Sequence, residues 1–252
     1  MASMKVLLFL YIGVFQFSFG QNSIDDEGRK QGEWKKYWDE SKQALQYKGT
    51  FVNDKPVGQF WYYYPTSEVR AIIEHISENQ SFVTYYFKNR EVMSEGMYLN
   101  QKRDSIWINY NNSGLTLSIE NFKNGKLEGK KVTFYIQNQI ENGDIKVLSE
   151  TFYKDSLKSG SYVERFSTGR VKLSGQYQLD QPFGVWRKYN TKGVFIQEFR
   201  YKNGLKNGWV INFNENQEVI LKELYKNGEL LSGDVRVKYL ETCKSKGVDP
   251  ND

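Results

Sequence analysis

The chain has 252 residues, of which 39% are hydrophobic, 26% charged and 16% aromatic. This is the composition of a globular chain, and its many aromatic residues and 21 glycines favour strands and tight turns over helices. One cysteine excludes an internal disulfide, one histidine excludes a His-cluster metal site, and the net charge of +5 is spread along the chain without a basic block. We therefore expect no metal, no cofactor and no nucleic-acid partner.

The first part of the chain, residues 1–20, has the pattern of a signal peptide. Lys5 precedes an apolar run of ten residues, and the small residues Ser18 and Gly20 stand at the −3 and −1 positions of a cleavage before Gln21. The run is about half of the roughly 20 apolar residues that a membrane-spanning helix needs. We expect export and a periplasmic or extracellular location.

The remaining chain divides into three parts. Residues 21–31 are interpreted as a polar linker, in which Asp25, Asp26 and Glu27 are solvated. A repeat array is predicted for residues 32–232, and residues 233–252 are interpreted as a partial ninth repeat followed by a polar tail. Cys243 lies in that tail, so we expect an exposed thiol.

The array repeats one frame, with a small residue at position 0, an aromatic residue at +2 and an aromatic residue at +5. Clear copies are GEWKKY, SIWINY and GVWRKY. Eight copies start near residues 32, 58, 80, 105, 129, 160, 184 and 208, which makes each unit 22–31 residues long. Position +5 is aromatic in seven copies and position +2 in six. The frame departs from this pattern at Ser105, Gln80, Lys131 and Arg165, where we expect irregular packing.

The second half of each unit is an alternating segment that ends in an aromatic residue and a turn. The turn reads Lys-Asn-Gly three times, and its glycines are Gly125, Gly204 and Gly228. Asn-Gly favours the type I′ hairpin turn, which needs positive φ at both central residues. Asn53-Asp54 and Asp155-Ser156 are degenerate copies of the same turn.

These patterns predict an all-β chain, an elongated single-layer antiparallel β-meander of about eight hairpin repeats. Roughly sixteen strands would extend on the order of 75 Å. The longest unit contains an insertion at Gln137–Asp144, expected as a longer hairpin loop. The segment Glu68–Ser77 comes nearest to a helical pattern, although its β-branched residues suit a strand equally.

The G-x-W-x-x-Y frame, the following Y-x-N-G turn and the glycine four residues later resemble the MORN repeat. The similarity extends over about residues 28–232 and is closest to the bacterial variant whose members are often labelled antitoxin components. It implies an elongated, single-layer twisted sheet with a shallow aromatic groove. It also implies a scaffold, a dimerisation element or a phospholipid binder, since MORN arrays have been assigned each of these roles.

The candidate binding residues are the aromatic side chains of the repeat frame. The +2 row comprises Trp34, Phe60, Phe82, Trp107, Tyr162 and Trp186. The +5 row comprises Tyr37, Tyr63, Tyr85, Tyr110, Phe134, Tyr189 and Phe213. The two positions differ by an odd number, so a regular strand would point them to opposite faces, whereas a bulged or strongly twisted strand could bring both to one groove. A single layer has no second layer to cover its rings, so we expect part of them to be accessible.

Catalysis finds no support in the sequence. His75 is the only imidazole and has no nucleophile motif nearby, and the glycines recur as turn residues rather than in a phosphate-binding loop. We predict an exported, non-enzymatic scaffold that binds a protein through its aromatic sheet. The alternatives are binding to a phospholipid or membrane surface, binding to an envelope glycan, and antitoxin-like inhibition of a partner toxin. Open sheet edges also raise a homodimer.

Overall fold

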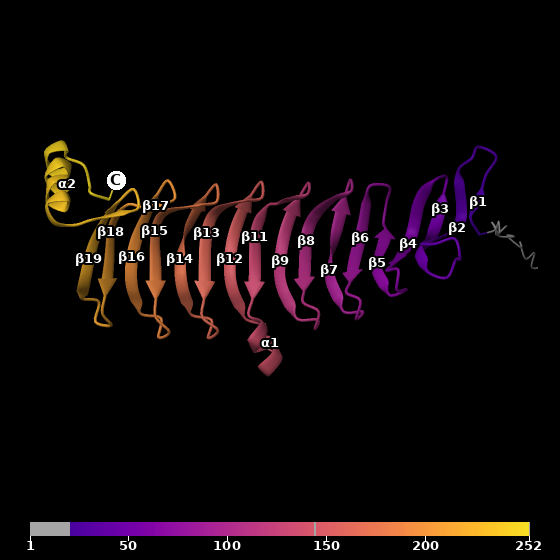
Figure 1. The fold of residues 1–252 in the computed structure, drawn as a ribbon, viewed down its shortest axis with the longest axis horizontal. Helices are drawn as coiled ribbons and strands as arrows, with labels where there is room; N and C mark the ends of the chain where they lie inside the picture. The colour runs from indigo at the N-terminus through magenta and orange to yellow at the C-terminus, as the bar shows by residue number, and fades with distance from the viewer. Residues whose placement is uncertain (1–20, 144, 252) are drawn as a thin grey trace, which may run out of the picture.

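The computed structural model describes residues 21–143 and 145–251. The proposed signal peptide, residues 1–20, lies outside the described residues, as do Asp144 and Asp252. Figure 1 shows one long row of strands that follow each other in chain order, with turns along both long edges. The expected all-β antiparallel meander is confirmed.

Most strands of the first half have 6 to 9 residues, whereas β1 and β10 have 2. They are β1 (Ser23–Ile24), β2 (Lys30–Tyr37), β3 (Leu45–Val52), β4 (Lys55–Tyr63), β5 (Val69–His75), β6 (Gln80–Tyr86), β7 (Val92–Leu99), β8 (Lys102–Tyr110), β9 (Thr116–Lys123), β10 (Lys126–Leu127) and β11 (Gly129–Phe134). The strands of the second half are β12 (Val147–Lys154), β13 (Leu157–Arg165), β14 (Val171–Gln178), β15 (Gln181–Tyr189), β16 (Phe195–Lys202), β17 (Leu205–Lys206), β18 (Gly208–Phe213), β19 (Val219–Lys226) and β20 (Glu229–Leu231). Two helices complete the fold, α1 (Ile136–Asn142) and α2 (Gly233–Lys246).

Most repeats contain two bulges at fixed positions, although the third repeat has neither a register shift nor a positive φ at the first of them. At position 0 the backbone has positive φ, for example +64° at Gly58 and +65° at Gly184, and Ser105 adopts the same conformation at +59°. This is why the frame needs a small residue there. The second bulge lies opposite position +5. In the seventh repeat Lys188 pairs with Gln197 and Tyr189 with Phe195, so Ile196 of β16 has no partner on β15. The strands are bent at both places.

The two-residue turns follow the predicted chemistry. Gly125, Gly204 and Gly228 have φ of +83°, +76° and +87°, and the asparagine before each also has positive φ. Both residues have positive φ in seven turns of this kind: 53–54, 100–101, 124–125, 155–156, 179–180, 203–204 and 227–228. A type I′ turn matches the right-handed twist of the strands it joins, which keeps the meander regular.

The third repeat begins one residue later than the sequence frame predicted. Val83 is completely buried and pairs with Ile73 and Gly96, and the recurrent bulge falls next to Tyr86. Ser81 is therefore position 0, Val83 is +2 and Tyr86 is +5. Consequently Phe82 does not belong to the +2 row and Tyr85 does not belong to the +5 row.

The segment predicted as a polar linker is folded. β1 pairs with β2, and the Asn22 side chain bonds the backbone N–H and C=O of Lys35 at 2.7 and 3.0 Å. Asp25 accepts hydrogen bonds from the backbone of Arg29 and the side chain of Gln31, and these lower its pKa to about 2. The N-terminal edge of the sheet is thus covered by the chain itself.

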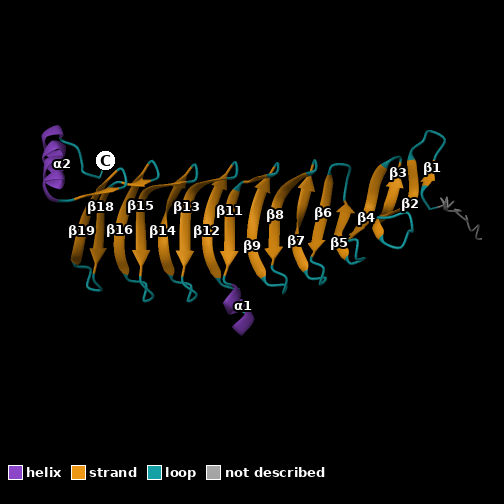
Figure 2. Cartoon of the chain, viewed as in Figure 1, coloured by secondary structure: helices purple, strands orange, loops and turns teal. Residues whose placement is uncertain are grey.

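The C-terminal segment is a helix rather than a partial repeat with a polar tail. α2 lies at the end of the sheet (Figures 1 and 2), where Lys226 Nζ stands 5.3 Å from the ring centroid of Tyr239. Beyond the helix, Asn251 Oδ1 accepts a hydrogen bond from the Trp209 backbone N–H at 3.0 Å. Cys243 is only 4% exposed, so the expectation of an exposed thiol is wrong.

The insertion in the fifth repeat also contains a helix, not only a hairpin loop. α1 projects from one long edge of the sheet (Figure 2). The Gln139 side chain anchors it, because its amide accepts from the Thr116 N–H and donates to the Thr116 C=O, both at 2.9 Å. The segment around Ile72 that came nearest to a helical pattern is strand β5.

The two faces of the sheet differ in burial. The core face carries the +2 residues, of which Phe60, Trp107 and Trp186 are 2%, 0% and 4% exposed. Gly175 of β14 lies next to Trp186 of β15 on this face, and a Cβ at Gly175 would stand 2.2 Å from the indole ring. Gly49 and Gly96 hold the same relation to Phe60 and Trp107, at 2.5 Å. We call the opposite face, which carries positions +1, +3 and +5, the outer face.

Candidate functional site

The structure places the two predicted aromatic rows on opposite faces. On the core face, the Trp107 ring packs edge-on against Tyr98 with centroids 5.2 Å apart. On the outer face, the Tyr110 hydroxyl donates a hydrogen bond to Glu95 Oε1 at 2.7 Å. The bulges do not bring the rows together, because the chain that carries +2 and +5 stays regular while the partner strand holds the extra residue.

The +2 rings form the packed interior of the sheet. Trp186 contacts Tyr162, Tyr177 and Phe199 at centroid distances of 5.6, 5.2 and 6.5 Å. The guanidinium of Arg103 lies 4.2 Å from the Trp107 ring centroid. Neighbouring rings and long basic side chains thus take the place of a second layer. Phe60, Trp107 and Trp186 are consequently not accessible to a ligand, while Trp34 and Tyr162 are only partly buried.

The +5 residues Tyr37, Tyr63, Tyr110 and Tyr189 are partly buried on the outer face, next to the turns of one long edge. Burial and the hydrogen bond to Glu95 raise the pKa of Tyr110 to about 12. Their ring contacts run along the edge: Tyr189 meets Phe195 at 5.9 Å, and Phe195 meets Phe213 at 4.8 Å. This row stabilises the bulged edge and offers ring edges rather than an open groove.

Position +3 organises the outer face. Its residues and their cross-strand partners form one continuous row along the whole sheet. The row reads Lys35, Lys48, Trp61, Ile72, Thr84, Glu95, Ile108, Ile119, Val132, Glu150, Val163, Ser174, Arg187, Glu198, Ile211 and Lys222. We call it the outer row. The repeat frame did not predict the outer row, because position +3 is not occupied by one residue type.

The middle of the outer row is apolar. Ile108, Ile119 and Val132 stand side by side on three neighbouring strands. Next to them Ile106 is 56% exposed and Phe152 is 40% exposed. Neither helix lies over these strands, because α1 projects from one long edge of the sheet and α2 lies at its C-terminal end (Figure 2). The surface made by these five residues is called the middle patch below.

Ion pairs neutralise the charges around and beyond the middle patch. Glu150 binds Lys130 Nζ at 3.1 Å and Arg165 Nη2 at 3.0 Å. Hydrogen bonds from Arg165 and Lys130 lower the pKa of Glu150. Farther along the outer row Arg187 Nε pairs with Glu198 Oε2 at 3.1 Å.

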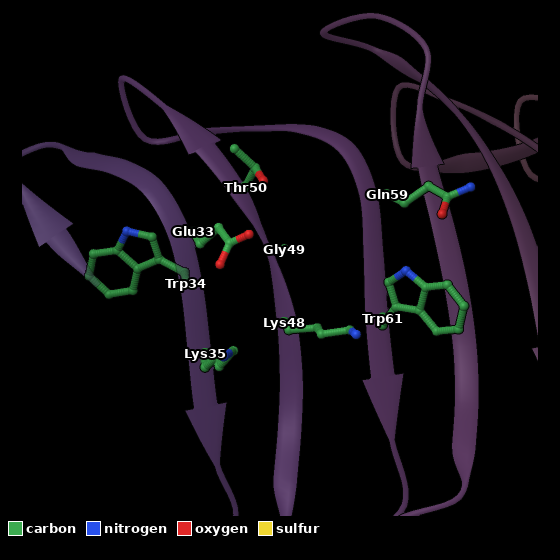
Figure 3. A pocket seen from close by; sticks show the side chains of 8 residues that line it. All are labelled: Glu33, Trp34, Lys35, Lys48, Gly49, Thr50, Gln59 and Trp61. Carbon is green, nitrogen blue, oxygen red and sulfur yellow. The ribbon is translucent and has the colours of Figure 1, made fainter. Parts of the chain in front are cut away.

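The N-terminal part of the outer row is different, because it borders a hollow of about 340 Å³. Figure 3 shows the side chains that line it, among them Trp61, Lys48, Lys35, Glu33 and Gln59. Lys48 Nζ stands 5.2 Å from the Trp61 ring centroid. Trp61 also borders a second hollow of about 430 Å³, whose lining includes Ile72 and Tyr86.

The remaining titratable side chains bear on whether the described residues could hold a metal ion. In residues 21–143 and 145–251 no three His, Cys, Asp or Glu side chains gather as a metal site would require. His75 packs edge-on against Phe60 with centroids 5.2 Å apart, and burial lowers its pKa. Over the same ranges no helix is long and apolar enough to cross a membrane.

No family model matches the chain, and no curated protein matches it. Among solved structures, the chain is similar to a crystal structure of TarM and to one of a point mutant of S. aureus TarM in complex with fondaparinux, alpha-GlcNAc-glycerol and UDP. Each is 17% identical with a TM-score of 0.18, over 73% of this chain and 22% of the TarM chain. The chain spans about a fifth of TarM, and at this TM-score the likeness carries no argument. The resemblance to the MORN repeat stays a prediction.

Proposed function

We propose that this chain is an exported, non-enzymatic repeat protein of MORN-like type that binds a protein partner through the middle patch of its outer face. The observation that carries the proposal is an uncovered apolar surface that lies between the charged residues Glu95 and Glu150 of the outer row. A core-face ring would serve poorly, since its burial already stabilises the fold.

The composition of the middle patch supports a protein partner. Protein interfaces combine an apolar, charge-depleted centre with a polar rim. Ile108, Ile119 and Val132 form such a centre, with Ile106 and Phe152 as more exposed anchors. An apolar surface of this kind on a single layer gains stability when a second layer is added by another chain.

The charges beside the middle patch favour a protein over an anionic lipid surface. Binding to anionic lipid relies on clustered lysines and arginines. Here Glu95 and Glu150 stand in the outer row itself, on either side of the three aliphatic residues. Lys130 and Arg165 are held by Glu150 in ion pairs, so their charge is not free to attract lipid headgroups.

Affinity capture with the mature chain, residues 21–252, tests the proposal. Ile106→Asp and Phe152→Asp each place a charge in the middle patch without touching a buried ring. Ile220→Asp is the matched control, since Ile220 is 65% exposed and lies in β19, near the C-terminal end of the sheet. A single protein captured in equimolar amount by the wild type and Ile220→Asp should then be purified and titrated. Each patch variant is expected to weaken its binding by roughly tenfold or more, the effect of losing an interface anchor.

Equal binding by the patch variants and the control would contradict the proposal. So would retention of the chain by anionic phospholipid vesicles with no captured protein, which would favour the lipid alternative.

A further inference from the structure

The N-terminal end of the outer row departs from the rest of the sheet in three ways. The first is Trp61. Position +3 holds Lys35, Trp61, Thr84, Ile108, Val132, Val163, Arg187 and Ile211 in the eight repeats, so Trp61 is the only aromatic residue there. The other seven repeats form without an aromatic ring at position +3. The packing of the repeat therefore does not require the Trp61 ring. It borders the 340 Å³ hollow on the outer face (Figure 3).

The second departure is a pair of like charges. Lys35 stands directly opposite Lys48 on the neighbouring strand, and Lys48 stands opposite Trp61. Like charges in direct cross-strand positions destabilise a sheet. Elsewhere the outer row places Arg187 opposite Glu198, which is the favourable arrangement. The Trp61 ring, 5.2 Å from Lys48 Nζ, offsets part of this repulsion, but no opposite charge does. A position that breaks such a rule is the kind of place where function is found.

The third departure is the lack of ion pairing. Neither Lys35 nor Lys48 forms an ion pair with any carboxylate in the described part of the chain, and Glu33 forms none there either. The three charges face one hollow together with Gln59 and Thr50, which can each donate and accept hydrogen bonds. Besides Trp34 and Gly49, this hollow thus offers two cations, one carboxylate, two neutral polar groups and the Trp61 indole ring.

We propose that this hollow binds an acidic sugar residue, a hexuronate unit of a glycan. The apolar face of the pyranose would lie on the exposed side of Trp61, and the sugar carboxylate would neutralise Lys35 and Lys48. Glu33, Thr50 and Gln59 would bond the hydroxyls. The single carboxylate of a hexuronate suits the site better than a doubly charged phosphate, because Glu33 stands in the same hollow and repels the larger negative charge.

A hollow of this size is at the lower end for small-molecule sites and suits one sugar ring of a longer chain. The site is separate from the middle patch and from the protein partner proposed above. Its failure would leave that proposal untouched, and the reverse also holds.

The test is titration of the mature chain, residues 21–252, with trisaccharides of galacturonate and of glucuronate, in which binding is measured by tryptophan fluorescence and by calorimetry. A neutral galactose trisaccharide is the matched ligand control. We expect saturable binding of at least one acidic trisaccharide, with a dissociation constant on the order of 1 mM or tighter, and binding of the neutral ligand at least tenfold weaker. Trp61→Ala should abolish binding. Arg187→Gln, a charge change on the same face but at the other end, should leave binding unchanged.

Lys48→Glu separates a binding role from a structural one. It turns the repulsive Lys35–Lys48 pair into an attractive pair, so the urea midpoint should rise while binding of the acidic trisaccharide is lost. Binding of neither acidic trisaccharide at about 10 mM would overturn the proposal. Equal binding of acidic and neutral ligands, or full binding by Lys48→Glu, would overturn it as well.

Discussion

The glycines beneath the buried rings make the sharpest prediction about stability. A Cβ added at Gly175 would lie 2.2, 2.3 and 2.6 Å from Cδ2, Cε2 and Cγ of Trp186, closer than Cβ atoms approach other carbons. Trp186 is 4% exposed and ringed by other aromatic side chains, so it cannot move aside without disturbing them. Gly175→Ala should therefore destabilise the chain by about 1–3 kcal/mol, the usual cost of overpacking.

The sign of this effect is informative. The φ of Gly175 is not in the left-handed region, so alanine fits the backbone, and alanine in a strand is normally favoured over glycine by about 0.5–1 kcal/mol. Without the clash the substitution would stabilise the sheet. The measurement is urea unfolding followed by far-ultraviolet circular dichroism, which does not depend on the tryptophan.

A double-mutant cycle completes the test. The chain already contains the alternative packing, because Val83 occupies the ring position opposite Ile73 in the third repeat. In a Trp186→Val background the Gly175→Ala penalty should vanish, giving a coupling energy of roughly 1–3 kcal/mol. A Gly175→Ala variant as stable as the wild type, or one equally destabilised in both backgrounds, would refute the packing argument.

Three further predictions concern titration and reactivity. The folded-state pKa of Asp25 is lowered to about 2 by its hydrogen bonds, so its stabilising effect should be full above the unfolded pKa and be lost as pH falls toward 2. Asp25→Asn should accordingly lower the unfolding midpoint at neutral pH and make little difference in strong acid. Burial raises the pKa of Tyr85, Tyr110 and Tyr162 to about 12, so a titration followed by tyrosinate absorbance should show a group of tyrosines that ionises only near pH 12. The free energy of unfolding should fall between about pH 10 and 12 as these side chains ionise. Early ionisation of every tyrosine would contradict their burial. Cys243 should react with a thiol reagent only after unfolding, and rapid reaction in buffer would show that α2 does not stay packed with this side chain buried.

The repeat frame was readable from the sequence because two of its positions have strict requirements. In every repeat but the third, position 0 has positive φ, which favours glycine. In most units a large side chain at position +2 packs over the neighbouring strand. The third unit was misaligned because Phe82 adjoins Val83 and Tyr85 adjoins Tyr86. The frame that starts one residue early has an aromatic residue at both positions, whereas the observed frame has Val83 at +2. The two alignments exchange the faces of the sheet, and burial and strand register distinguish them.

Other features had no local signal. Val235 and Val237 of α2 are exposed and only Cys243 of the helix is buried, so no apolar stripe marks it as a helix. It is held by contacts with the last strands, which the sequence of the helix does not encode. The like-charged Lys35–Lys48 pair is equally invisible in sequence, since the two residues meet only through the strand register. Trp61 could have been found by comparing position +3 across the repeats.

The direction of the strands has a mechanical consequence. The described ends of the chain lie at opposite ends of the sheet, and the strands run across its long axis (Figure 1). Tension between the ends would therefore pull neighbouring strands apart. The hydrogen bonds between two strands would open one after another instead of being sheared all at once. A molecule stretched between its ends should lengthen in small steps at low force, each released unit of 24 residues adding on the order of 80 Å. Relaxation would allow each hairpin to close again on its neighbour.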